Sequence, residues 1–178
     1  MKKYLIGSWL VIKNYIFAMI FFYIFFVGFY SRASLFSIAV FILMILLMYG
    51  ELSHQAGVDK RRYGSIRLYD GAIYGLLAIV PFILIQIIIS LLNLQFDVVD
   101  FEILKWNLVK GFAAPMLFIA KAGGYGFIGY AAAWATIVLA AFLGYFAGYK
   151  NFDLNAYIRQ VLRLQPKQKN TNKRKRRF

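Results

Sequence analysis

Glu51 and His54 have the spacing of a metal-binding pair, Glu-x-x-His. Residues three apart on a helix lie on one face, and carboxylate-bridged metal sites in helix bundles use such pairs. Those sites need two pairs and two further carboxylates, whereas this chain has one histidine, so a second copy would have to supply the other pair. The alternative prediction is that Glu51 and His54 form a polar cap at a helix end, paired with Lys60, Arg61 or Arg62.

The glycine-rich stretch 124–129 resembles two ligand-binding patterns. It fits G-x-G-x-x-G, but a dinucleotide site needs a preceding strand, and here apolar membrane segments flank the stretch. It also reads Gly-Tyr-Gly after a short apolar segment, as in potassium-channel filters. The filter threonine and valine are missing, and Lys121 would place a positive charge near the pore. We therefore expect these glycines to loosen the entrance to a spanning helix.

Catalytic patterns are incomplete in this chain. Asp70-Gly71-Ala72 begins like the Asp-Gly-x-x-Ala-Arg motif of phosphatidyl-alcohol transferases, but Ile73 and Tyr74 follow and the later residues of that motif are missing. There is no cysteine, hence no thiolate nucleophile or disulfide, and there is no Ser-His-Asp set. The sequence predicts a protein that is not an enzyme and has no cofactor.

The composition of the chain indicates the class of protein to which these residues belong. Hydrophobic residues make up 62% of the 178 residues and charged residues 16%. A soluble domain is about 45–50% apolar and about 25% charged, and disorder needs low hydrophobicity. These values exclude a soluble globular protein and a disordered one, and they favour an integral membrane protein.

Four charge-free stretches are long enough to cross the membrane. A spanning helix needs about 20 mostly apolar residues. The stretches predict an all-α polytopic membrane protein with four transmembrane helices, plus short interfacial helices. The expected spans, within a transmembrane domain at 14–152, are 14–31, 33–50, 71–95 and 123–149. The apolar run between Lys110 and Lys121 contains Pro115 and is too short to span, so it is either interfacial or re-entrant.

Basic residues predict the orientation. Of the 21 Lys and Arg, 17 fall on the side of the two termini and the 51–70 loop, and four fall on the other side. Cytoplasmic loops carry the excess of Lys and Arg, so both termini are expected in the cytosol. The prediction is a multi-pass protein of the plasma membrane.

Segments outside the spans are expected at the inner membrane surface. Residues 1–13 form a cytosolic interfacial segment or extend the first helix; a signal peptide is the competing interpretation of the start. Residues 153–165 predict an amphipathic helix, which lies in the interface or packs on the bundle ends. Residues 166–178 predict a disordered basic tail that contacts anionic lipid, with nucleic acid the less favoured partner. Its lipid-headgroup residues are Lys167, Lys169, Lys173, Arg174, Lys175, Arg176 and Arg177.

Small residues recur along the fourth predicted span. Side chains of this size at helical spacing let another helix approach closely. Packing within one chain and contact with a second copy or a membrane partner both fit this groove. The predicted helix-packing residues are Gly129, Ala132, Ala133, Thr136, Ala140, Gly144 and Gly148.

Three short stretches carry a resemblance at the family level: Tyr49-Gly50-Glu51, Arg62-Tyr63-Gly64 and 148–152. On them the chain resembles uncharacterised small multi-pass membrane proteins of low-GC Gram-positive bacteria, and the resemblance implies no activity. The leading functional prediction is a non-enzymatic subunit that packs with itself or a membrane partner. A channel, permease component or export subunit is the alternative. It would need a polar path near Gln86 and Ser90, although Gln86 more simply predicts an interhelical hydrogen bond.

Overall fold

The computed structural model describes residues 2–26, 28, 32–64, 66–91 and 101–150, except for the side chains of 101–104. Its elements are helices α1 (Lys2–Phe26), α2 (Ala33–Tyr63), α3 (Asp70–Leu91), α4 (Phe101–Phe112), the 3-10 turn η2 (Ala114–Met116), α5 (Leu117–Ala122) and α6 (Phe127–Tyr149). Four of them, α1, α2, α3 and α6, are long and apolar enough to cross a membrane. The predicted all-α fold with four spans is confirmed.

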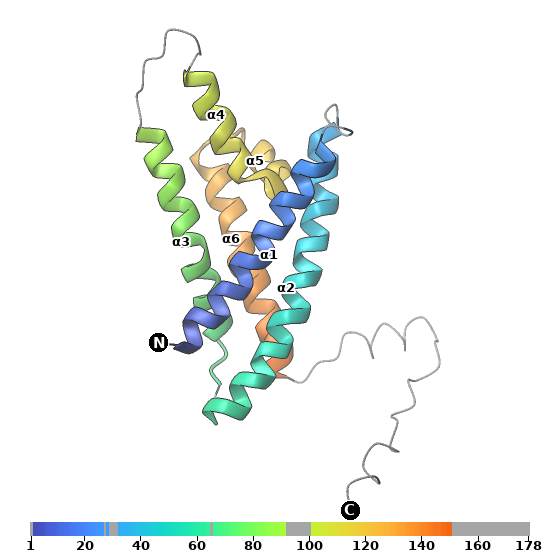
Figure 1. The fold of residues 1–178 in the computed structure, drawn as a ribbon, viewed down its shortest axis with the longest axis vertical. Coiled ribbons are helices and arrows are strands. Elements are labelled where there is room, and N and C mark those ends of the chain that lie inside the picture. Colours follow the sequence, from blue (N-terminus) through green and yellow to red (C-terminus); the bar gives the residue numbers. More distant parts are fainter. Residues whose placement is uncertain (1, 27, 29–31, 65, 92–100, 151–178) are drawn as a thin grey trace, which may run out of the picture.

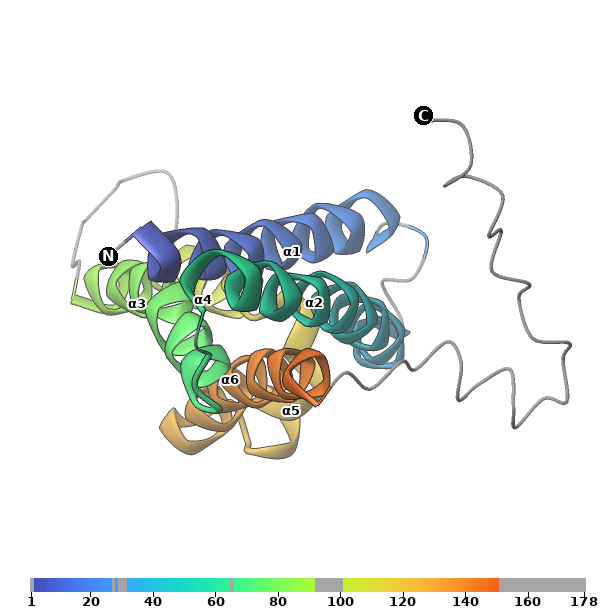
Figure 2. The same cartoon turned by 90° about the horizontal axis from the view of Figure 1, so that it is seen from below.

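The four spanning helices form one closed bundle. Each packs mainly against two others, in the order α1, α2, α6, α3 and back to α1 (Figure 2). The start of α1, the ends of α2 and α6 and the start of α3 lie together at one end of the bundle, called here the α2–α3 loop end (Figure 1). This end carries the basic residues Lys60, Arg61, Arg62 and Arg67.

The first helix includes the segment before the first apolar span. Helix α1 starts at Lys2, so residues 2–13 extend the first helix, which is one of the two predicted alternatives. Lys13 and Asn14 lie within the continuous helix, and the side chain of Glu51 on α2 binds both. Val11 and Tyr15 are buried, so α1 contributes to the core on both sides of this polar pair.

The second helix extends well past its apolar stretch. Helix α2 has 31 residues, which at about 1.5 Å each is longer than the roughly 30 Å of hydrocarbon. The predicted span 33–50 is only its first part, and most of the expected 51–70 loop is helical. Leu52, Gln55 and Asp59 continue the inward-facing stripe and are buried. Gly64, with a φ of +69°, ends the helix in the left-handed conformation that glycine adopts without strain.

Residues 101–122 form a re-entrant hairpin. Helix α4 enters the bundle beside α3 from the end opposite the α2–α3 loop, and α5 returns toward the same end (Figure 1). At the tip between them, Ala114, Pro115 and Met116 are buried against α1 and α2. The short Pro-containing run therefore lies inside the bundle.

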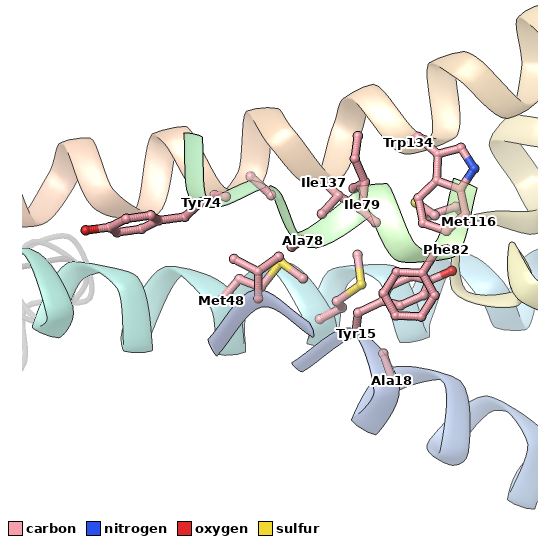
Figure 3. Close-up of a cluster of buried hydrophobic side chains, with 14 of the residues drawn as sticks. Tyr15, Ala18, Met48, Tyr74, Ala78, Ile79, Phe82, Met116, Trp134 and Ile137 are labelled. Atoms are coloured by element: carbon pink, nitrogen blue, oxygen red, sulfur yellow. The ribbon is translucent and has the colours of Figure 1, made fainter. Parts of the chain in front are cut away.

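The core fills the space between the hairpin tip and the α2–α3 loop end. Met48, Ala78 and Ile137 pack near its centre, as Figure 3 shows. Toward the hairpin, the rings of Tyr15 and Trp134 both pack on Phe82, with ring centroids 4.8 Å and 5.8 Å away. Stacked and edge-on aromatic pairs of this kind stabilise a core beyond simple burial, by about 0.5–1.5 kcal/mol each.

Candidate functional site

A buried carboxylate, Asp59, lies where α2, α3 and α6 meet at the α2–α3 loop end. Its side chain is fully buried and accepts three hydrogen bonds. Gln55 donates to one oxygen at 2.8 Å, and Tyr74 and Tyr145 donate to the other at 2.6 and 3.1 Å. A buried carboxylate is tolerated only when donors replace the lost water. These donors come from three helices, so Asp59 fixes the helices relative to one another.

Asp70 is the second buried carboxylate of this end. It begins α3, and Lys3 of α1 forms an ion pair with it at 2.5 Å. Tyr4 donates to its other oxygen at 3.3 Å, and the backbone N–H of Arg67 donates at 2.9 Å. An acid in the first turn is also favoured by the helix dipole. Asp70 therefore holds the start of α1 against the start of α3.

Together these groups form the carboxylate cluster, defined as Asp59 and Asp70 with the side chains bound to them: Lys3, Tyr4, Gln55, Tyr74 and Tyr145. The ring of Tyr74 contacts the rings of Tyr4 and Tyr145 edge-on, with centroids 5.9 and 5.3 Å apart. Sequence reasoning missed the cluster because Asp59 and Asp70 were assigned to a solvated loop.

Two glycines make room for the tyrosines. A Cβ at Gly7 would overlap the Tyr74 ring, and one at Gly71 would lie 2.5 Å from the Tyr145 Cβ. A Cβ at Gly75 would lie 2.8 Å from the Val138 Cα of α6. Gly71 and Gly75 therefore allow α3 to pack closely against α6.

Glu51 binds residues of α1, which corrects the predicted pairing with Lys60, Arg61 or Arg62. Lys13 donates to one carboxylate oxygen at 2.7 Å, and Asn14 donates to the other at 2.9 Å. Lys60, Arg61 and Arg62 lie nine or more residues further along the same helix, two to three turns away.

The Glu51–His54 pair does not converge on one point in the structure. Glu51 points to α1, whereas His54 lines a cavity beside α6. Among the residues that the structure describes, no three His, Asp or Glu side chains are grouped to hold a metal ion.

Polar side chains of three spanning helices bind backbone groups of the re-entrant hairpin that have no helical partner. A break between helices leaves carbonyl and N–H groups without helical partners, which membrane proteins tolerate only where something else binds them. Tyr15 of α1 donates to the carbonyl oxygen of Phe112. The N–H of Phe118, in the first turn of α5, donates to the Ser37 hydroxyl of α2 at 3.1 Å.

Gln86 of α3 is the third of these anchors. Its amide donates to the Val109 carbonyl oxygen of α4 at 3.3 Å, and its oxygen accepts from the indole of Trp134 in α6 at 2.9 Å. The predicted interhelical hydrogen bond of Gln86 is confirmed. Hydrogen bonds between membrane helices contribute about 0.6–2 kcal/mol each, so these anchors hold the hairpin firmly.

The helix-packing residues predicted on α6 do not share one environment. Gly129 lies against the α5 turn, and Gly144 and Gly148 lie against the backbone of α2 at Tyr49 and Ser53. The remaining members of the set are buried in the case of Ala133 and Ala140, half-buried for Thr136 and exposed for Ala132.

The helix predicted at 153–165 and the basic tail at 166–178, with its seven lipid-headgroup residues, lie outside the described residues.

Comparisons of the chain with protein-family models, with curated proteins and with solved structures find no match.

Proposed function

We propose that the protein is a non-enzymatic subunit of the membrane that works by packing against a second membrane-embedded chain. The observation that carries this proposal is how the fold uses its intramembrane polar groups. Tyr15, Ser37, Gln86 and Trp134 bind the re-entrant hairpin or one another. Because these groups bind one another within the chain, we expect the bundle to be rigid. Its lipid-facing surface is then available for contact with another chain.

The outer half of α6 is the surface best suited to such a contact. Ala131, Ala132 and Ala135 are exposed there, next to Ile128. Alanines in this arrangement allow the backbone of another helix to come close, and a close approach gains dispersion contacts along the crossing. A second copy is the simplest partner to test.

The lack of cysteine in the chain makes a clean crosslinking experiment possible. We expect Ala135→Cys to form an oxidation-dependent dimer in native membranes, at about twice the 20.5 kDa of the chain. The matched control is Ile42→Cys, an exposed position at similar depth on α2. Equal crosslinking at both positions would show random collision, and crosslinking to a chain of another mass would identify a different partner. No crosslink at Ala135 to any chain would contradict the proposed contact.

Orientation in the plasma membrane, with both termini in the cytosol, is part of the same proposal and is supported by the 17-to-4 distribution of basic residues. Because α2 extends to Tyr63, a thiol probe belongs in its exposed last turn and not at the buried Asp59. We expect Arg62→Cys to react with an impermeant maleimide only after cells are opened, and Gly126→Cys to react on intact cells. The reverse pattern would invert the topology, and reaction of both on intact cells would contradict four spans.

A channel or permease component is the second candidate, and the re-entrant hairpin favours it. Broken helices that enter a bundle often line the sites where substrates or ions pass. The tip residue Ala114 is buried, so Ala114→Cys should stay unreactive to small water-soluble thiol reagents in a packed subunit. Rapid reaction there would indicate a water path and favour transport.

A further inference from the structure

A cavity of about 270 Å³ opens between the final turns of α2 and the end of α6. Its lining consists of Ser53, His54, Gly57, Val58 and Arg61 of α2 and Gly148 of α6. At about 30 Å³ per water molecule, this volume is large enough for a small polar group together with bound water. The cavity is separate from the carboxylate cluster, which lies on the buried face of the same helix.

The shape of the cavity follows from helical spacing. Residues 54, 57, 58 and 61 are separated by three, one and three positions, so they lie on one face of α2. His54 and Arg61 are two turns apart, about 10 Å along the helix axis. Between them, a Cβ built on Gly57 meets nothing within 4 Å, so the helix backbone forms an open floor.

The charge in this cavity is positive and uncompensated among the described side chains. His54 and Arg61 are exposed, and within the described part of the chain neither makes a hydrogen bond or an ion pair. The carboxylates described at this end are bound elsewhere: Glu51 by α1, Asp59 and Asp70 inside the cluster. Exposed Lys60, Arg62 and Lys150 add to the local positive potential.

The cavity also lies at the level expected for lipid headgroups. Its first residue, Ser53, comes three positions after the charge-free stretch 33–50 of α2 ends. That stretch is about as long as the hydrocarbon core is thick, so the cavity begins at the boundary between hydrocarbon and water. Basic pockets between membrane helices at this level are known to bind anionic headgroups.

We propose that this cavity binds a phosphate group, supplied by the headgroup of an anionic phospholipid. The Arg61 guanidinium presents paired donors that match two phosphate oxygens, and His54 can donate from its ring N–H. The Ser53 hydroxyl provides a third donor. Free phosphate ions offer the same chemistry, and the experiment distinguishes the two sources. The site does not depend on the proposed contact of α6 with a second chain.

His54 provides a direct reporter, because it is the only histidine in the chain. The full-length protein, labelled with ¹⁵N-histidine alone, is placed in phosphatidylcholine nanodiscs with an increasing share of phosphatidylglycerol. We expect the imidazole resonances to shift in a saturable way. In a second arm, inorganic phosphate is added to nanodiscs of phosphatidylcholine only. A shift with lipid alone identifies the headgroup as the ligand, and a shift with phosphate identifies the free ion.

Matched variants separate a defined site from general attraction to a charged surface. Arg61→Gln should raise the phosphatidylglycerol share at half-saturation about tenfold, the loss expected for one charge-assisted pair. Arg62→Gln removes the same charge from a neighbouring face of α2 and should change it less than about twofold. Gly57→Leu should fill the cavity and abolish the shift while the protein stays folded, because open space surrounds that position.

Three results would overturn the site. The first is the absence of a His54 shift with either ligand. The second is an equal loss of affinity in Arg61→Gln and Arg62→Gln, which would mean that the lipid responds only to net charge. The third is a normal shift in Gly57→Leu, which would place the ligand outside the cavity.

Discussion

Asp59→Leu should destabilise the bundle by about 3–5 kcal/mol, because each buried donor left without a partner costs about 1–3 kcal/mol. Leucine fills a similar volume but accepts no hydrogen bond. The hydroxyls of Tyr74 and Tyr145 and the amide of Gln55 would then be buried without an acceptor. The measurement is thermal unfolding of the purified protein in mild detergent, with Asp59→Asn as the conservative variant. Asparagine keeps one accepting oxygen, so we expect it to cost only about 1–2 kcal/mol.

A rescue variant tests the same explanation. Replacing both partners of a buried hydrogen bond by apolar groups is often nearly neutral. Combining Asp59→Leu with Tyr74→Phe and Tyr145→Phe should therefore recover much of the lost stability. If the triple variant were no more stable than Asp59→Leu alone, the hydrogen bonds would not be the reason that Asp59 is needed.

Gly148→Ala should lower stability by about 3 kcal/mol, the upper part of the range for overpacking a close contact. The added methyl group would overlap the Ser53 carbonyl oxygen and lie 2.8 Å from the Ala56 Cβ, so α6 and α2 would have to separate. For a chain of this size, that loss lowers the melting temperature by roughly 6–12 °C. Unfolding in detergent, with size-exclusion chromatography in parallel, measures both stability and oligomeric size.

Two further glycines give a graded control for this prediction. At Gly144 the nearest atom to an added Cβ is the Tyr49 Cα at 3.1 Å, and at Gly50 nothing lies within 4 Å. Stability should therefore decrease in the order Gly50→Ala, Gly144→Ala, Gly148→Ala, with unchanged size throughout. Loss of a dimer without loss of monomer stability would instead mean that these glycines contact another chain.

The membrane-spanning architecture could be predicted from sequence because its signal is local. Each span is a run of apolar residues, and Arg32 separates the first two spans. The extension of α2 could not be predicted in this way. Asp59 suggests a solvated loop until its partners are known, and Tyr145, one of them, is 86 residues away. A charge pattern read along the chain cannot reveal an acceptor that distant donors will satisfy.

The same limit applies to the hairpin and to Glu51. Composition indicated that the run around Pro115 is too short to span, but its position depends on Tyr15, which lies 97 residues from Phe112 in sequence. Glu51 was expected to pair with nearby basic residues, yet Lys13 binds it from another helix, 38 positions away. Gly144 and Gly148 lie against the backbone of α2, and these contacts require only that no side chain intervene.

The anchoring of the hairpin has a consequence for the biogenesis of the protein. Tyr15, Ser37 and Gln86 all precede the hairpin residues that they bind. A ribosome therefore delivers the three spans that carry them before it delivers residues 101–122. The hairpin therefore emerges next to a prepared set of donors and acceptors, and its broken backbone need not be stranded in lipid. Only Trp134, which binds Gln86 from the last helix, arrives afterwards. The order of synthesis thus matches the order in which these bonds can form, and α6 completes the structure last.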